Sequence, residues 1–252
     1  MNFRHFLLII LAFYITACKQ EKKHLTRIEG KQISISDNLD INTEIDAIIK
    51  PYRECVNKDL DSVLAYAVHT YSKSDGDLNT AIGNFMADVI YNQANPVFKS
   101  RTGHTIDMVL LNHGGIRSII SKGNVTTRTA FKIMPFENSI VVVALEGKSI
   151  NDLINYLKNS KRAHPISKLK LTLDKDYNIS EALINGKTID TLKTYYVATN
   201  DYLYNGGDKM TFFKPNDSVY ALDYKIRNAL LDYFYKTDTI NPVIDDRFIQ
   251  LK

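Results

Sequence analysis

The chain has 252 residues, of which 44% are hydrophobic and 24% are charged, the balance of an ordinary globular protein rather than a disordered one. Its net charge of +4 is spread along the sequence, and no run of like charges is long enough to form a nucleic-acid-binding arm, so a nucleic-acid partner is not expected. The length allows one large domain or two small ones.

The first 17 residues have the features of a secretory signal peptide. Arg4 precedes an apolar run at residues 6–13 that is too short to cross a bilayer stably, and Ile15-Thr16-Ala17-Cys18 follows. Small residues directly before a cysteine resemble the lipobox of bacterial lipoproteins, which implies cleavage before Cys18 and a lipid on its thiol. The alternative is a plain secretory signal with an incidental cysteine. The lipobox predicts a lipid-anchored protein of the bacterial cell envelope, on the periplasmic or the surface side of a membrane.

A polar, charged stretch follows, and we expect residues 18–38 to be the lipidated cysteine and its tether, with room for one short strand at residues 32–35. The globular domain is then predicted at residues 39–252. Its first element is a helix over residues 42–57, disturbed near Pro51. Cys55 lies in this helix and is expected to be a small buried hydrophobe, because lipidation of Cys18 would leave it without a disulfide partner.

Apolar patterning predicts the remaining elements. Strands are expected over residues 63–68, 105–111, 140–145, 169–173 and 195–198, and helices over residues 79–93, 149–159 and 223–235. A short helix begins at Thr126 or Thr127 and ends near Met134, because Pro135 cannot continue it. Asn185-Gly186 is a hairpin signal. This mixture predicts a single α/β (α+β) domain with a mixed β-sheet flanked by helices.

Residues 112–117, Asn-His-Gly-Gly-Ile-Arg, follow one of the predicted strands. Gly114 and Gly115 let the backbone turn sharply and let a ligand approach without a Cβ in the way. Asn112 and Arg117 stand on either side of the two glycines. Asn112 offers an amide and Arg117 a planar guanidinium with several N–H donors, which together suit a phosphate or a set of hydroxyls. Taken alone, a tight turn with a solvated arginine explains these six residues equally well.

Two further motifs follow in order. Met-Pro-Phe-Glu-Asn at residues 134–138 enters the strand at 140–145, and Asn-Asp-Tyr-Leu-Tyr-Asn-Gly-Gly-Asp at residues 200–208 follows the strand at 195–198. Together with residues 112–117 they resemble the C-terminal substrate-binding domain of the 5'-nucleotidase family, over about residues 60–250. Three motifs in the same order are far more specific than any one of them.

The resemblance implies roles for these residues. Phe136 and Tyr202 would stack on the two faces of a nucleobase, at about 1–3 kcal/mol per stacked base. Asp208 would accept hydrogen bonds from the ribose hydroxyls, and Asn138 would lie near the base. The complete predicted substrate-binding set is Asn112, Gly114, Gly115, Arg117, Phe136, Asn138, Tyr202, Gly206, Gly207 and Asp208. The alternative is that both aromatics belong to the core and that Asp208 is a turn residue.

Two stretches outside these motifs also bear on the resemblance. Gly-Asn-Phe-Met-Ala-Asp at residues 83–88 resembles a family helix whose N-terminal turn points toward the nucleotide. Residues 73–77, Lys-Ser-Asp-Gly-Asp, contain no arginine where the family usually has substrate-binding arginines. Lys73 offers only a point charge in their place.

Catalytic machinery is missing from the sequence. Hydrolysis in the family is performed by an N-terminal metallophosphatase domain with two metals, which generate the attacking hydroxide. The six histidines (His5, His24, His69, His104, His113 and His164) show no ligand-like short spacing, and no nucleophile elbow or phosphate-cradling glycine loop is present. We therefore predict no catalytic residue, metal ligand or cofactor in this chain, and expect divalent metals in a separate catalytic partner.

Three functions fit these observations. The first is the nucleotide-recognition part of a 5'-nucleotidase-like phosphohydrolase that needs a separate metallophosphatase chain for hydrolysis. The second is an envelope lipoprotein that binds nucleosides or nucleotides without a catalytic role. The third is a scaffold with a decayed pocket, suggested by the missing arginines and by Lys168 near a position where the family often has glycine.

Overall fold

A computed structural model describes residues 24–36 and 38–251. The chain divides into two units, residues 1–48 and 49–252. The predicted signal peptide and Cys18 lie outside the described residues. Residues 24–36 are exposed and contain no helix or strand, so the short strand predicted at residues 32–35 is wrong. Within the described ranges, no helix combines the length and the apolar character needed to cross a membrane.

The first helix, α2 (Thr43–Leu60), is in the predicted place and continues through Pro51. The side chain of Asn42 caps it by accepting the backbone N–H groups of Glu44 and Ile45, each at 3.1 Å. No residue of α2 is buried, so Cys55 is exposed and its predicted burial is wrong. The periodicity of α2 predicts an apolar stripe, but a stripe is buried only where another part of the protein packs against it. Among the described residues, no element buries the stripe of α2.

A five-stranded sheet forms the centre of the second unit, in the order β10-β4-β9-β2-β5. Its strands are β2 (Met108–Leu110), β4 (Ser139–Glu146), β5 (Ile166–Ser167), β9 (Thr194–Asn200) and β10 (Ser218–Lys225). The β2–β9 pair is parallel and the other pairs are antiparallel. Val142 packs in one core and Val141 and Val143 in another, so the unbroken apolar run of β4 reflects a strand that is buried on both faces.

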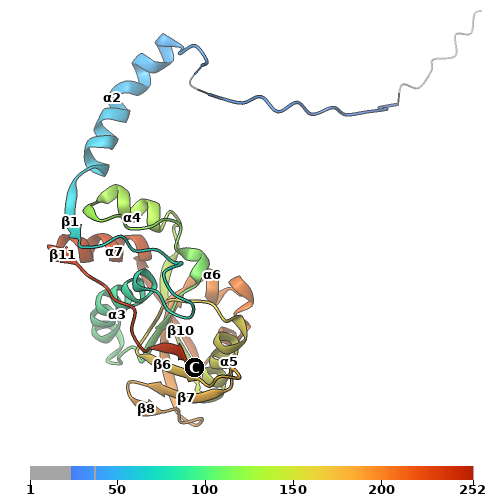
Figure 1. Cartoon of the computed structure of the whole chain (residues 1–252), viewed down its shortest axis with the longest axis vertical. Coiled ribbons are helices and arrows are strands. Elements are labelled where there is room, and N and C mark those ends of the chain that lie inside the picture. The colour runs from blue at the N-terminus through green and yellow to red at the C-terminus, as the bar shows by residue number, and fades with distance from the viewer. Residues whose placement is uncertain (1–23, 37, 252) are drawn as a thin grey trace, which may run out of the picture. The chain divides into compact units, whose positions relative to one another are not determined.

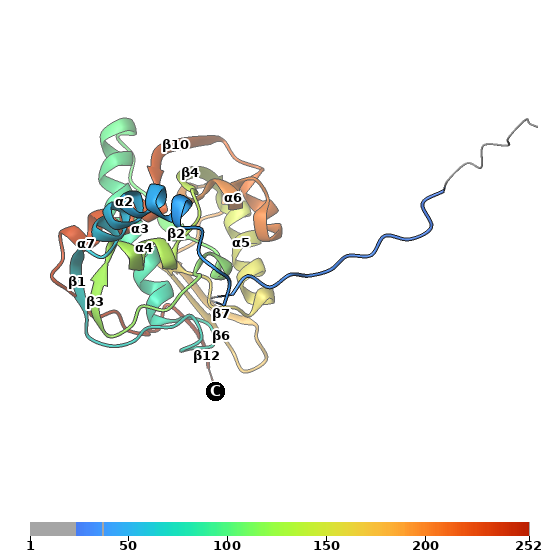
Figure 2. The same cartoon turned by 90° about the horizontal axis from the view of Figure 1, so that it is seen from above.

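Helices cover both faces of this sheet (Figures 1 and 2). One face carries α3 (Ala81–Thr102) and α7 (Ile226–Tyr235), whose apolar side chains join those of α4 (Thr127–Ile133) in the first core. The other face carries α5 (Gly147–Ser160) and α6 (Asp201–Tyr204). The large aliphatic side chains of α5 are all buried there: Ile150, Leu153, Ile154 and Leu157.

Two smaller sheets complete the unit. A three-stranded sheet is formed by β11 (Thr239–Ile240), β1 (Val63–Ala67) and β3 (Gly123–Thr126). A four-stranded sheet is formed by β12 (Phe248–Gln250), β6 (Leu169–Leu173), β7 (Ile179–Ile184) and β8 (Lys187–Thr188). All three sheets contain parallel and antiparallel pairs. The α/β fold class is thus confirmed, but the predicted mixed sheet is three mixed sheets.

Local signals account for several boundaries. Thr126 caps α4 in a reciprocal pair with Thr129, as predicted, and the Asn185-Gly186 hairpin turn has φ angles of 51° and 72°. The predicted helix at residues 223–235 begins only at Ile226, because the preceding residues form β10. Asp223, with φ of 50°, lies inside β10 where the strand shifts its register against β4, and the strand then continues to Lys225, directly before the helix.

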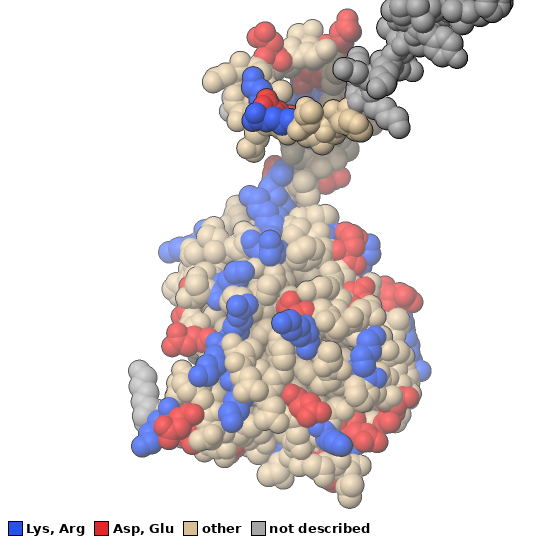
Figure 3. Space-filling model, turned by 90° about the vertical axis from the view of Figure 1, so that its right-hand side faces the viewer, with Lys and Arg blue, Asp and Glu red and all other residues tan. Residues whose placement is uncertain are grey.

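Charged side chains of both signs are distributed over the face shown in Figure 3. Lys and Arg side chains gather in a column on one half of the globular part, and Asp and Glu side chains are scattered around it (Figure 3). An exposed ion pair contributes only about 0–1 kcal/mol to the free energy of unfolding. The stability of the fold therefore depends on its two hydrophobic cores rather than on its surface charges.

Candidate functional site

The three sequence motifs meet at one edge of the central sheet. The carboxyl ends of the parallel strands β2 and β9 lie at this edge, and the antiparallel strand β4 begins there. Residues that follow β2 and β9 and residues that precede β4 are therefore brought together. They enclose a cavity of about 330 Å³. Its lining residues are Asn112, Gly114, Gly115, Arg117, Met134, Phe136, Asn138, Asn200, Tyr202 and Asp208.

The loop after β2 supplies the first wall. Asn112 is buried and precedes the 3₁₀ helix η1 (His113–Gly115). Gly114 and Gly115 are not among the described glycines with positive φ, so the turn itself does not require them. A Cβ on Gly115 would instead lie 3.0 Å from the side-chain oxygen of Asn112. Gly115 therefore leaves room for the Asn112 amide.

Arg117 lies at the open side of the cavity. Its guanidinium carbon is 5.7 Å from the ring centroid of Phe136, and its Nη1 donates to the carbonyl of Gly114 at 3.4 Å. The side chain is exposed, so most of its donors face solvent. A guanidinium in this position can bind an anionic group that enters the cavity.

Two aromatic rings at the cavity are half exposed: Phe136 at 43% and Tyr202 at 46%. This exposure excludes the alternative that both belong to the hydrophobic core. Met134 lines the same cavity and is buried. The cavity thus offers apolar faces next to the polar groups of Asn138 and Asp208, a combination typical of sites for small organic ligands.

The loop after β9 is held by internal hydrogen bonds. The Tyr202 hydroxyl donates to Asp208 Oδ1 at 2.9 Å, and this bond raises the pKa of Tyr202. The Tyr156 hydroxyl donates to the backbone carbonyl of Asp208 at 2.9 Å. Asp208 itself has a left-handed backbone, with φ of 51°. A carboxylate has about four acceptor positions, so Asp208 keeps capacity for ligand hydroxyls after binding Tyr202.

Gly206 and Gly207 do not line the cavity, although both belong to the predicted binding set. Gly206 has a φ of 91°, a conformation that favours glycine. A Cβ on Gly207 would lie 2.4 Å from the Tyr202 ring. Their place in the fold is therefore to shape the loop and to admit the tyrosine ring.

Asn200 and Met134 line the cavity without having been predicted as site residues. Asn200 ends β9 and caps α6, with its side-chain oxygen accepting the backbone N–H of Leu203 at 2.8 Å. The signal for Asn200 is present in the sequence, because an asparagine between a strand and a short helix is a typical cap. Met134 opens the motif at residues 134–138, where Pro135 ends the helix, so its place beside the site could also have been read from the sequence.

Two histidines that are far apart in the sequence meet behind the first loop. The backbone N–H of His113 donates to Nδ1 of His164 at 3.3 Å. His164 is buried, and burial and then the nearby His113 lower its pKa to about 4. Nδ1 acts as an acceptor, so the neutral ring carries its proton on Nε2, which has no partner among the described residues. His113 itself is half-buried.

The stability of the protein should fall in acid through His164. Its pKa is about 4 in the folded chain against 6.5 ordinarily, so the unfolded chain takes up the proton first as the pH falls. This stability is fully present above about pH 6.5 and lost toward pH 4, a difference of about 3 kcal/mol. Urea denaturation near pH 7 and pH 4 would measure it. His164→Asn, which keeps an acceptor near Nδ1, should show a smaller loss, and an equal loss would refute the assignment.

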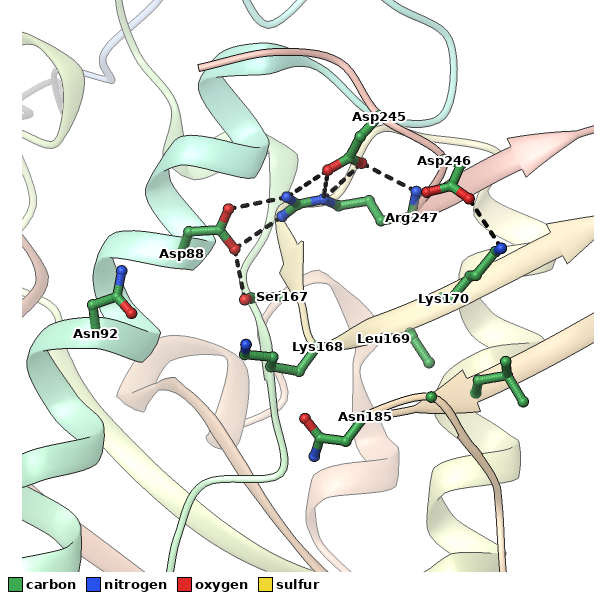
Figure 4. A pocket seen from close by; sticks show the side chains of 12 residues that line it. Asp88, Asn92, Ser167, Lys168, Leu169, Lys170, Asn185, Asp245, Asp246 and Arg247 are labelled. Carbon is green, nitrogen blue, oxygen red and sulfur yellow. Dashed lines mark hydrogen bonds and ion pairs between the residues drawn. The ribbon is translucent and has the colours of Figure 1, made fainter. Parts of the chain in front are cut away.

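A larger cavity, of about 670 Å³, lies on another part of the unit (Figure 4). Several of its polar groups bind one another. Arg247 donates to the carboxylates of Asp88 and Asp245 at 2.7–3.1 Å, and Ser167 donates to Asp88 at 2.6 Å. Arg247 Nη1 also donates to the carbonyl of Ile166 at 2.7 Å. These groups tie the chain together, so we assign the cluster to stability rather than to ligand binding.

The same cluster changes the interpretation of residues 83–88. The Asn84 side chain donates to Asn79 and to the carbonyl of Val243, each at 3.0 Å, and Asp88 binds Arg247. None of the residues 83–88 lines the cavity at the three motifs. Residues 83–88 therefore contribute no side chain to the lining of that cavity, and the orientation of the helix toward a nucleotide stays a prediction. In addition, no group of three or more His, Cys, Asp or Glu side chains within residues 24–36 and 38–251 is arranged to hold a metal ion.

Residues 54–215 match the family model described as 5'-nucleotidase, C-terminal domain. Cell wall protein Lmo0130 of Listeria monocytogenes is 29% identical over 199 residues, which are 73% of this chain and 24% of that protein. An apyrase of Tabanus yao is 24% identical over 248 residues, 87% of this chain and 43% of that protein.

Among solved structures, the 5'-nucleotidase precursor from Thermus thermophilus superimposes with a TM-score of 0.69 at 22% identity. The match covers 82% of this chain and 43% of that protein, and at this identity it shows a shared fold. The chain spans less than half the length of each of these three proteins.

Proposed function

The chain belongs to the 5'-nucleotidase family, as its C-terminal domain, and on this premise we propose that the cavity at the three motifs recognises a nucleotide. The base would stack between Phe136 and Tyr202, with Asn138 at its edge. The ribose hydroxyls would bind Asp208, and Asn112 and Arg117 would lie around the ribose and phosphate. This is the assignment that the family motifs imply.

One observation carries the proposal: three segments from separate parts of the sequence converge on one cavity of about 330 Å³. It holds two half-exposed rings, a carboxylate and a guanidinium, which match the flat base, the diol and the anionic phosphate of a nucleotide. A volume of about 300–1,000 Å³ is usual for a small-molecule site.

Hydrolysis would need a second chain. The described residues offer no cluster of metal ligands, so the proposed role is to hold the nucleotide while a separate metallophosphatase chain, with its own divalent metals, cleaves the phosphoester. The names of the apyrase and of the Thermus 5'-nucleotidase support a link to nucleotide phosphate chemistry.

A second candidate function is an envelope lipoprotein that binds nucleosides or nucleotides and has no catalytic role. The lipobox-like sequence before Cys18 favours anchoring by a lipid, and the similarity to a protein named for the cell wall supports an envelope location. Both functions use the same cavity. They differ in whether a catalytic chain is present, which a search for a metallophosphatase gene beside this one would address.

The purified chain from residue 19 onward should bind AMP or adenosine and should release no phosphate from AMP when manganese or zinc is added. Calorimetric titration would measure the binding, and a phosphate assay the hydrolysis. Failure to bind any nucleoside or nucleotide at millimolar concentration would refute the proposed function. Phosphate release at an enzymatic rate would refute the need for a second chain.

A further inference from the structure

One buried arginine binds the backbone of residues 134–136, the segment that carries Phe136. Arg227 lies on α7 and is only 6% exposed. Its Nη1 lies 3.2–3.4 Å from three successive carbonyl oxygens, those of Met134, Pro135 and Phe136. Arg227 is 91 residues from Phe136 in sequence and lies beyond residues 54–215, the region that matches the family model.

A carboxylate next to Phe136 links the same segment to two cations. Glu137, next to Phe136, forms ion pairs with Nη2 of Arg227 and with Lys225. These two cations, Lys225 first, lower the pKa of Glu137 to about 2, so the carboxylate is charged at any ordinary pH. The segment is therefore joined to the start of α7 through its backbone and through this side chain.

The shape of the guanidinium matters here as well as its charge. Its central carbon lies over the ring of Phe131, 4.2 Å from the ring centroid, while Nη1 reaches the carbonyls and Nη2 reaches Glu137. Nε is buried and has no partner among the described residues. A lysine has a single ammonium on a flexible stem, so it can contact one or two of these acceptors but cannot span them all. Burying a cation is costly unless such partners are present.

We propose that Arg227 is the positioning residue for the aromatic platform, by which we mean the ring of Phe136. Its guanidinium fixes residues 134–137 so that this ring projects into the cavity. The affinity of the cavity for a flat ring depends on that fixation. The second half of this inference rests on the proposed function. The first half concerns the free protein and can be tested without a ligand.

The sequence contains no tryptophan, so Phe136→Trp places a single fluorescent reporter at the platform. In this background we would compare Arg227→Lys with Arg247→Lys. Both replace a largely buried, ion-paired arginine that lies outside the cavity lining. They differ in their partners, because Arg227 donates to the carbonyls of residues 134–136, whereas Arg247 binds Asp88, Asp245 and the carbonyl of Ile166. Glu137→Gln, on an exposed side chain, serves as a milder second variant that should fold even if Arg227→Lys does not.

The expected result in the free protein is a lower fluorescence anisotropy and faster acrylamide quenching of the residue 136 reporter in Arg227→Lys, with a smaller change in Glu137→Gln and none in Arg247→Lys. With the native Phe136, calorimetry should show AMP affinity about tenfold weaker in Arg227→Lys and unchanged in Arg247→Lys, since the loss should approach the contribution of one stacked base.

An unchanged reporter signal in both Arg227→Lys and Glu137→Gln would overturn the inference, as would equal changes in Arg227→Lys and Arg247→Lys. A parent protein that binds no nucleotide would refute the proposed function instead, and the reporter signal would still decide whether Arg227 positions the platform. A loosened reporter with unchanged AMP affinity would overturn the link between ring position and binding.

Discussion

Replacing Arg247 with methionine should lower the free energy of unfolding by about 3 kcal/mol. The Arg247 side chain is 17% exposed and neutralises both Asp88 and Asp245, so its removal leaves two carboxylates close together without their cation. This loss of about 3 kcal/mol in the free energy of unfolding is the low end of the range for a broken buried ion pair, because both carboxylates are partly exposed. Urea denaturation would give the value.

Lys170→Met is the matched control for this substitution. Lys170 lines the same cavity and pairs with Asp246 at 2.9 Å and with Glu181 at 3.7 Å, but its side chain is 41% exposed. Solvent screens such a pair, so the control should lose no more than about 1 kcal/mol. Equal losses in the two variants would show that the Arg247 cluster stabilises the fold no more than a surface ion pair does.

Phe136→Ala and Tyr202→Ala should each weaken AMP binding by about 5- to 150-fold, which corresponds to the 1–3 kcal/mol attributed to one stacked base. Calorimetric titration of the two variants and the parent would measure the change. Tyr235→Ala is the control, because this tyrosine is exposed and lies on α7 without lining the cavity. The control should bind AMP as the parent does.

Tyr202→Phe separates the two contributions of that residue. It keeps the ring but removes the hydroxyl that donates to Asp208 at 2.9 Å. Its affinity should lie between those of the parent and Tyr202→Ala, because the ring still stacks while Asp208 loses one of its restraints. If neither alanine substitution changes the affinity, the rings do not stack on the ligand, and the decayed-pocket scaffold is the better description.

Much of the candidate site could be predicted because its residues directly follow or precede apolar strands. Of the predicted site residues, Asn112 follows β2, Asn138 precedes β4 and Tyr202 follows β9, and these three strands are neighbours in one sheet. Strand patterns are local and strong, so the motifs were placed correctly once the strands were. The fold class followed from the same patterns, whereas the number of sheets depends on pairing between distant strands.

The rest could not be predicted because it depends on contacts between residues that are far apart in the sequence. No local pattern relates Arg227 to Phe136 or Arg247 to Asp88, which is 159 residues away. The exposure of Cys55 depends on whether α2 meets a second surface, and periodicity does not contain that information. Gly207 looks like a ligand contact in the motif, but its missing Cβ makes room for Tyr202.

The two small sheets have a consequence for synthesis and folding. β11 pairs in parallel with β1, and β12 pairs in parallel with β6, so residues 239–250 supply the second neighbour of strands made much earlier. While the chain is being made, β1 and β6 each present a row of unsatisfied backbone groups, the type of edge that promotes aggregation. Pairs this distant in sequence also form slowly. These two edges are therefore covered only after residues 239–250 have been made.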